Sequence, residues 1–107
     1  MDYSEIFKSD IEGNVAVAES VRIKEPKRYG VYFFNDDYTT TDFVVEVLIK
    51  YYNKSEIEAD TLMRRVHERG SALIGSYSYD IAKTLVHLTI DDARSKGFPL
   101  RCTLQEL

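Results

Sequence analysis

The chain has 107 residues, a length that suits one domain with a single hydrophobic core. Its formal net charge is −4 and its lysines and arginines form no run, so the basic face that nucleic-acid binding requires is not expected. The single cysteine allows neither an internal disulfide nor a cysteine-based zinc site. No apolar run approaches the roughly 20 residues of a membrane helix, and the N-terminus is acidic where a signal peptide would be basic. We therefore expect a soluble, cytoplasmic protein with no membrane partner.

Residues 1–25 have mixed charge and no sustained helical or strand period, which predicts a flexible N-terminal extension. Pro26 and its charged neighbours separate this extension from the rest of the chain, because proline pushes the preceding residue out of helical geometry. We expect the folded domain to occupy residues 26–107, with regular structure from about Arg28.

Aromatic and β-branched residues predict a strand from Gly30 to Phe34, with Val31 and Phe33 on one face. The polar turn Asn35–Thr39 follows this strand.

A helix is then expected to run to about Tyr52, with Thr39 as its N-cap and Asp42 three residues later. Its apolar stripe comprises Phe43, Val44, Val47, Leu48 and Tyr51.

A second helix is predicted between a capping box of Ser55 and Glu58 and a stop at Gly70. The spacing of its apolar residues places His67 on the packed side of this helix. The other residues of that side are Ala59, Leu62, Met63 and Val66.

Residues 72–77 predict a strand, and a third helix is expected from about Tyr79 to Gly97, followed by a strand over residues 100–104. The order β-α-α-β-α-β favours a single small α+β domain, in which a three-stranded, largely antiparallel sheet packs on three helices. The residues of the third helix expected to face inward are Ile81, Leu85 and Leu88.

The turn and the second helix together suggest a binding site. Asn35, Asp37 and a neutral His67 all accept hydrogen bonds, and a free α-ammonium group offers several donors and a positive charge. Beside apolar walls, these groups predict a pocket for a free N-terminus with a bulky side chain. Asn and Asp are also favoured in turns for purely local reasons, and an inward histidine is often a satisfied core residue.

Two catalytic alternatives use the same residues. A thiol hydrolase would pair Cys102 with His67, but no nucleophile motif surrounds Cys102, whose place in a strand suits a small buried residue. A metal site would draw on Asp36, Asp37 and His67, although no paired-cysteine or H-x-x-x-H spacing occurs. We expect neither catalysis nor a metal or other cofactor.

Residues 35–48, NDDYTTTDFVVEVL, resemble the NDDYTPMEFVVEVL signature of the ClpS adaptors of ATP-dependent Clp proteases. Later blocks are also similar to that family: Val66-His67 with Gly70, Ala93-Arg94, and the closing Pro99-Leu100-x-Cys102-Thr103-Leu104. The similarity covers about residues 26–107.

The resemblance implies a non-enzymatic adaptor that holds proteins beginning with Leu, Phe, Tyr or Trp and passes them to a Clp AAA+ unfoldase for degradation. By position, Asn35, Asp37 and His67 would hold the α-amino group, Asp37 through water. The side-chain pocket would be lined by Phe34, Thr39, Val44, Met63, Val66 and Leu100.

The chain departs from the family pattern in three places. Thr40 replaces a proline, which is a mild change at the first helical position. Thr41 replaces the methionine at the pocket rim, which predicts room for Ile and Val unless Phe33 or Phe34 refills the space.

The third departure lies in the patch that the resemblance assigns to the N-terminal domain of a ClpA- or ClpC-like unfoldase. The family's EVAETKV reads DIAKTLV here, so the interface residues would be Asp80, Lys83 and Leu85. A module of similar fold that contacts an unfoldase without reading N-termini is the main alternative.

Overall fold

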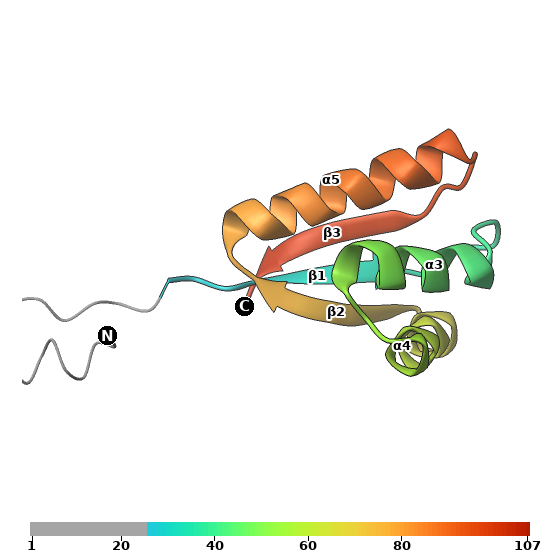
Figure 1. Cartoon of the computed structure of the whole chain (residues 1–107), viewed down its shortest axis with the longest axis horizontal. Coiled ribbons are helices and arrows are strands. Elements are labelled where there is room, and N and C mark those ends of the chain that lie inside the picture. Colours follow the sequence, from blue (N-terminus) through green and yellow to red (C-terminus); the bar gives the residue numbers. More distant parts are fainter. Residues whose placement is uncertain (1–25) are drawn as a thin grey trace, which may run out of the picture.

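The computed structural model describes residues 26–107, so the predicted flexible extension of residues 1–25 lies outside the described residues. The chain order is the predicted β-α-α-β-α-β (Figure 1). The elements are β1 (Tyr29–Phe34), α3 (Thr41–Tyr52), α4 (Glu56–Arg69), β2 (Ser71–Tyr77), α5 (Tyr79–Ser95) and β3 (Arg101–Glu106).

The three strands form one sheet in the order β2-β1-β3, and β1 is antiparallel to both neighbours. Tyr29, at the start of β1, pairs with Tyr77 on one side and with Glu106 on the other. The predicted three-stranded antiparallel sheet is therefore confirmed. Phe34 is the last residue of β1. Because β1 is the central strand, the turn that follows Phe34 lies at the middle of one end of the sheet (Figure 1).

The helices cover one face of the sheet. Val31 and Phe33 are both fully buried, whereas Tyr32 and Phe34 on the opposite face are only half-buried, as the alternation of a strand requires. The Phe33 ring meets the Tyr52 ring of α3 edge-on at 5.4 Å between centroids. The predicted assignment of Val31 and Phe33 to one buried face is confirmed.

Helix α4 has the predicted ends. The Ser55 side chain accepts from the backbone N–H of Glu58, the Glu58 carboxylate accepts from the backbone N–H of Ser55, and both distances are 3.1 Å. Gly70 closes the helix in the left-handed conformation, with φ of 87°, which a side chain would strain.

No helix within residues 26–107 combines the length and apolar character needed to cross a membrane.

The expected inward face of α5 is partly wrong. Ile81 and Leu88 are 53% and 40% exposed, and Leu85 is half-buried. The residues that α5 buries are Ala82, Thr89 and Ala93. Small side chains on this stripe let the helix approach β3 closely, which turns the larger apolar residues toward solvent.

The predicted N-cap of α3 is also wrong. Thr40, not Thr39, caps the helix by accepting from the backbone N–H of Phe43 at 3.1 Å. Thr39 is instead hydrogen-bonded to Asp36 within the preceding turn. On the buried stripe of α3, Tyr52 takes the place expected for Tyr51, which is only half-buried.

Candidate functional site

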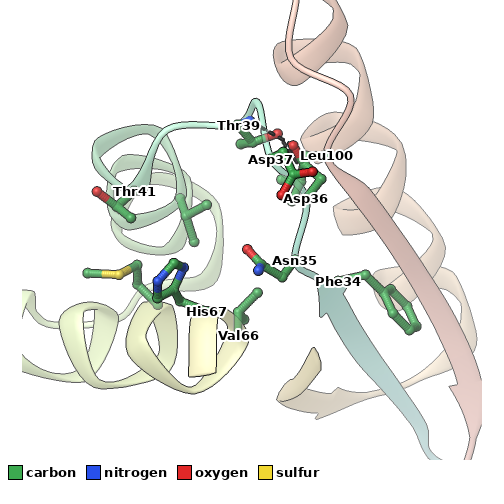
Figure 2. Close-up of a pocket in the computed structure, with 11 residues that line it drawn as sticks. Phe34, Asn35, Asp36, Asp37, Thr39, Thr41, Val66, His67 and Leu100 are labelled. Carbon is green, nitrogen blue, oxygen red and sulfur yellow. Dashed lines mark hydrogen bonds between the residues drawn. The ribbon is translucent and has the colours of Figure 1, made fainter. Parts of the chain in front are cut away.

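A pocket of about 240 Å³ lies where β1 ends, between the 35–39 turn, the start of α3 and the second half of α4 (Figure 2). We call it the main pocket. All ten residues predicted for amine and side-chain binding line it, together with Asp36. The lining residues are Phe34, Asn35, Asp36, Asp37, Thr39, Thr41, Val44, Met63, Val66, His67 and Leu100.

The main pocket is polar at its rim and apolar at its floor. Asn35, Asp37 and His67 are exposed at the rim. The floor is formed by side chains that are almost completely buried, with Val66 at 4% exposure and Leu100 at 1%. A ligand with a charged end and an apolar body matches this gradient, because each part meets a surface of its own kind.

His67 is not on the packed side of α4, as the sequence pattern suggested. The buried residues of the helix are Ala59, Leu62 and Val66, and the position after Val66 lies a further 100° around the helix. That rotation carries the imidazole to the exposed rim of the main pocket. Figure 2 shows the Asn35 side chain pointing toward His67 across the pocket.

Asp36 shapes the turn rather than the rim. Its carboxylate accepts from the backbone N–H of Tyr38 at 2.8 Å, from the backbone N–H of Thr39 at 2.7 Å and from the Thr39 hydroxyl at 2.7 Å. Partial burial raises the pKa of Asp36, but the Thr39 and Tyr38 hydrogen bonds and the positive charge of Arg94 outweigh that effect, so this pKa lies below its ordinary value.

The turn is also tied to α4 through the backbone. The N–H of Asn35 donates to the carbonyl of Gly70 at 2.8 Å. This bond leaves the Asn35 side chain free to face the pocket. In the part of the chain that the structure describes, the side chains of Asn35, Asp37 and His67 have no hydrogen-bond partner, so their acceptor atoms are available to a ligand.

Arg94 supports the wall that carries Leu100, a role the sequence reasoning missed. Its Nη1 donates to the carbonyl of Phe98 at 2.7 Å and to that of Leu100 at 3.0 Å. Both bonds hold the connection between α5 and β3 against the pocket. An arginine in the last helical turn before a Gly-Phe-Pro segment is the signal that could have revealed this role, because such residues often bond to the carbonyls at a helix end.

Cys102 lies in the sheet core and not at the main pocket. It is 3% exposed, and its sulfur is 3.8 Å from the Tyr52 hydroxyl, which also bonds to Thr89. Burial raises the pKa of the thiol to about 12, although the Tyr52 hydrogen bond acts in the opposite direction. This placement agrees with the structural role expected from the sequence and separates Cys102 from His67.

Within residues 26–107, no group of three or more His, Cys, Asp or Glu side chains is arranged to hold a metal ion.

The predicted partner patch lies on α5. Asp80 and Lys83 are exposed and Leu85 is half-buried. Asp80 and Lys83 border a groove of about 630 Å³ along the helix. Its other lining residues are Thr84, Val86, His87, Leu88, Ile90 and Leu104.

The chain is similar to known proteins over most of its length. A family model described as "ClpS: ATP-dependent Clp protease adaptor protein ClpS" matches residues 24–103. An adapter protein ClpS from Oleidesulfovibrio alaskensis is 46% identical over 85 residues, which are 79% of this chain and 82% of the relative. One from Wolinella succinogenes is 44% identical over 98 residues, which are 92% of this chain and 94% of the relative.

A solved structure is similar as well. The ClpS2 of Agrobacterium tumefaciens bound to L-phenylalaninamide superimposes with a TM-score of 0.75 at 36% sequence identity, covering 78% of this chain and 100% of the other. The agreement in sequence and fold leads to one assignment. The chain belongs to the ClpS family of ATP-dependent Clp protease adaptor proteins.

Proposed function

We propose that this protein is an N-degron adaptor, which binds proteins whose first residue is Leu, Phe, Tyr or Trp and delivers them to a Clp AAA+ unfoldase. The observation that supports this most strongly is the main pocket, whose rim offers unused acceptors above a buried apolar floor. The ClpS2 relative binds L-phenylalaninamide, which has a free α-amine and an aromatic side chain. Both features of that ligand match the two parts of the pocket.

The amine would be held at the rim. An α-ammonium group has an unperturbed pKa of about 7.7 to 8.0 and is largely charged at neutral pH. The Asn35 amide oxygen, the Asp37 carboxylate and the neutral His67 imidazole can each accept one of its protons, Asp37 through a bridging water. A peptide nitrogen within a chain has one proton and no charge, so the same rim discriminates against internal sequences.

The side chain of the first residue would enter the floor. Pockets for drug-sized molecules have about 300 to 1,000 Å³, and the main pocket, with about 240 Å³, is smaller. This size suits one large side chain. Val44, Val66 and Leu100 are all nearly buried, so they would provide apolar contact for that side chain.

Delivery would use the α5 patch that includes Asp80, Lys83 and Leu85. Ile81, between two of these residues, is 53% exposed, and Leu88 is 40% exposed on the same helix. Exposed apolar side chains beside charged ones are typical of protein interfaces. We assign this surface to the N-terminal domain of a ClpA- or ClpC-like unfoldase.

Peptide titration tests the degron-binding half of the proposal. A Leu-initiated peptide with a free N-terminus should bind, and the same peptide with an acetylated N-terminus should not. Asn35→Ala should weaken binding by about 1.5 kcal/mol, the lower end of the range for hydrogen bonds to charged groups, because the rim is exposed. Gln105→Ala, which removes an exposed amide from β3, is the matched control and should bind like the wild type.

The rival function predicts a different result. A module that contacts an unfoldase without reading N-termini would bind neither peptide, or both equally, while still associating with the unfoldase. Equal binding of the free and the acetylated peptide would therefore reject the adaptor assignment in favour of the rival.

A further inference from the structure

A second hollow adjoins the main pocket and has no role in the function proposed above. We call it the side hollow; its volume is about 350 Å³. Three of its lining residues also line the main pocket, so the two spaces share a wall. Its lining residues are Phe34, Asn35, Asp36, Gly70, Pro99 and Arg101.

Arg101 gives the side hollow a positive charge. Its guanidinium lies over the Phe34 ring, 4.6 Å from the centroid, and this stacking restrains a side chain that is otherwise exposed. Among residues 26–107, no carboxylate lies within 4.0 Å of the Arg101 guanidinium. Its charge and its hydrogen-bond donors are therefore available to a ligand.

The other charged group of the side hollow is already engaged. Both carboxylate oxygens of Asp36 accept hydrogen bonds from Tyr38 or Thr39, and the positive charge of Arg94 acts on the same carboxylate. Asp36 therefore cancels less of the positive charge of Arg101 in the side hollow than a carboxylate without hydrogen bonds would. The unengaged carboxylate of the turn, Asp37, lines the main pocket and not the side hollow.

A peptide held in the main pocket would reach the side hollow with its second residue. Asn35 borders both spaces, and adjacent Cα atoms are about 3.8 Å apart. In an extended peptide, successive side chains point in opposite directions. Figure 2 shows the Phe34 side chain turned away from Thr41 and His67, and Phe34 also lines the side hollow.

We infer that Arg101 makes this adaptor favour an acidic second residue, Asp or Glu, in the substrates that it binds by their first residue. The inference rests on the proposed function, since it requires the N-terminus to occupy the main pocket. Arg101 is exposed, and an exposed ion pair changes affinity by about two- to fivefold. The net charge of the chain, −4, acts in the opposite direction on any acidic peptide, so such a preference requires a local cation.

Three peptides that differ only at the second residue test this inference: Leu-Glu, Leu-Gln and Leu-Lys, each followed by the same neutral sequence. The wild type should bind them in that order of decreasing affinity, and the difference should shrink at high salt because exposed ion pairs are screened. In Arg101→Gln the preference for Glu over Lys should fall by about two- to fivefold. Arg65→Gln, which removes an exposed arginine of α4 that lines neither space, is the matched control.

The outcomes separate the two proposals. If the Leu-Gln peptide binds and its acetylated form does not, the main pocket reads N-termini whatever Arg101 does. If the wild type and Arg101→Gln then show the same ratio of affinities for the Glu and Lys peptides, the inference about Arg101 is wrong. The salt dependence of the wild type provides a test that needs no variant, since a difference in affinity between the Glu and Lys peptides that does not shrink at high salt excludes an ion pair.

Discussion

Asn35 and Asp36 are adjacent in the sequence, but their side chains have different roles. Asp36 accepts three hydrogen bonds from its own turn, whereas Asn35 uses its backbone to bond Gly70 and points its side chain toward His67 (Figure 2). If the Asn35 side chain accepted these hydrogen bonds from the turn in place of Asp36, the rim would lose the Asn35 acceptor. The recognition chemistry we propose therefore depends on Asp36 without any direct contact between Asp36 and the ligand.

Thr41 lines the main pocket, and we expect its short side chain to leave the rim wide. The alternative, that Phe33 or Phe34 fills the space left by a family methionine, is not supported, because Phe33 is buried against Tyr52 and Phe34 turns its ring away from Thr41. We expect the wild type to accept Ile- and Val-initiated peptides. In Thr41→Met, binding of Ile relative to Leu should weaken by about 1 kcal/mol or more, measured by peptide titration.

The control for this comparison is Thr61→Met, which adds the same side chain at an exposed position of α4 outside the main pocket. It should leave the preference between Ile and Leu unchanged. If the wild type rejects Ile as strongly as Thr41→Met does, Thr41 does not widen the rim.

Cys102 should be unreactive in the folded protein. Its side chain is 3% exposed and its pKa is raised to about 12, so little thiolate forms at neutral or weakly alkaline pH. Labelling with a thiol reagent near pH 8 should be slow in buffer and fast in denaturant. Rapid labelling of the native protein, accompanied by loss of a hydrolytic activity, would instead support the thiol hydrolase.

Residue-level features were predictable where their cause was local. The Ser55–Glu58 capping box and the left-handed Gly70 depend on a few neighbouring residues, and both were found from the sequence. The cap of α3 was not, because Thr39 and Thr40 both suit the role and the outcome depends on the bonds that Asp36 makes. The presence of His67 at the site was predictable, but its exposure was not. The spacing of apolar residues shows which side of a helix is buried, but not whether a residue at the border of that side is itself buried.

At the scale of elements, the stability of the 35–39 turn should depend on pH through Asp36. The pKa of Asp36 is lower in the folded protein than its ordinary value of 3.8, so its carboxylate stabilises the fold above that pH. The stabilisation is lost as the pH falls below 3.8 and through the folded pKa. We expect Asp36→Asn to lower the free energy of unfolding by about 1 to 2 kcal/mol at pH 7 and by less in acid.

Urea unfolding of the wild type and Asp36→Asn at several pH values measures this difference. Asp37→Asn is the matched control, because Asp37 bonds to no residue in the described part of the chain and should contribute little to stability. A destabilisation by Asp36→Asn that stays constant down to the most acidic pH would show that the charge of Asp36 does not support the turn.

The order and type of the elements followed from the sequence, and the inward face of α5 did not. Strand alternation and capping signals are local, so β1 and α4 were placed within one or two residues of their observed bounds. In α5 the large apolar residues suggested one stripe, while the helix buries Ala82, Thr89 and Ala93. Close approach to the sheet decides that choice, and the sequence of one helix does not contain this information. Exposed Ile81 and Leu88 are consistent with a partner surface, which is a reason for such residues to depart from the core pattern.

At the scale of the molecule, the main pocket and the start of the described chain lie at opposite ends of the sheet (Figure 1). Arg28 is beside the C-terminus, where its carbonyl accepts from the backbone N–H of Leu107 at 2.9 Å. The pocket residues begin only at Phe34, where β1 ends. Residues 1–25 are therefore attached far from the proposed binding site.

This separation predicts that binding and delivery can be uncoupled. Deletion of residues 1–25 should leave the affinity for a Leu-initiated peptide unchanged, because the main-pocket residues of the described part of the chain run from Phe34 to Leu100 and supply both the rim and the floor. The same deletion should abolish unfoldase-dependent degradation of a Leu-initiated substrate if these residues serve the hand-over, as we propose. Peptide titration and a degradation assay on the same truncated protein provide both measurements. Weaker peptide binding by the truncated protein would show that residues 1–25 complete the site, and undiminished degradation would show that the α5 surface alone is sufficient for delivery.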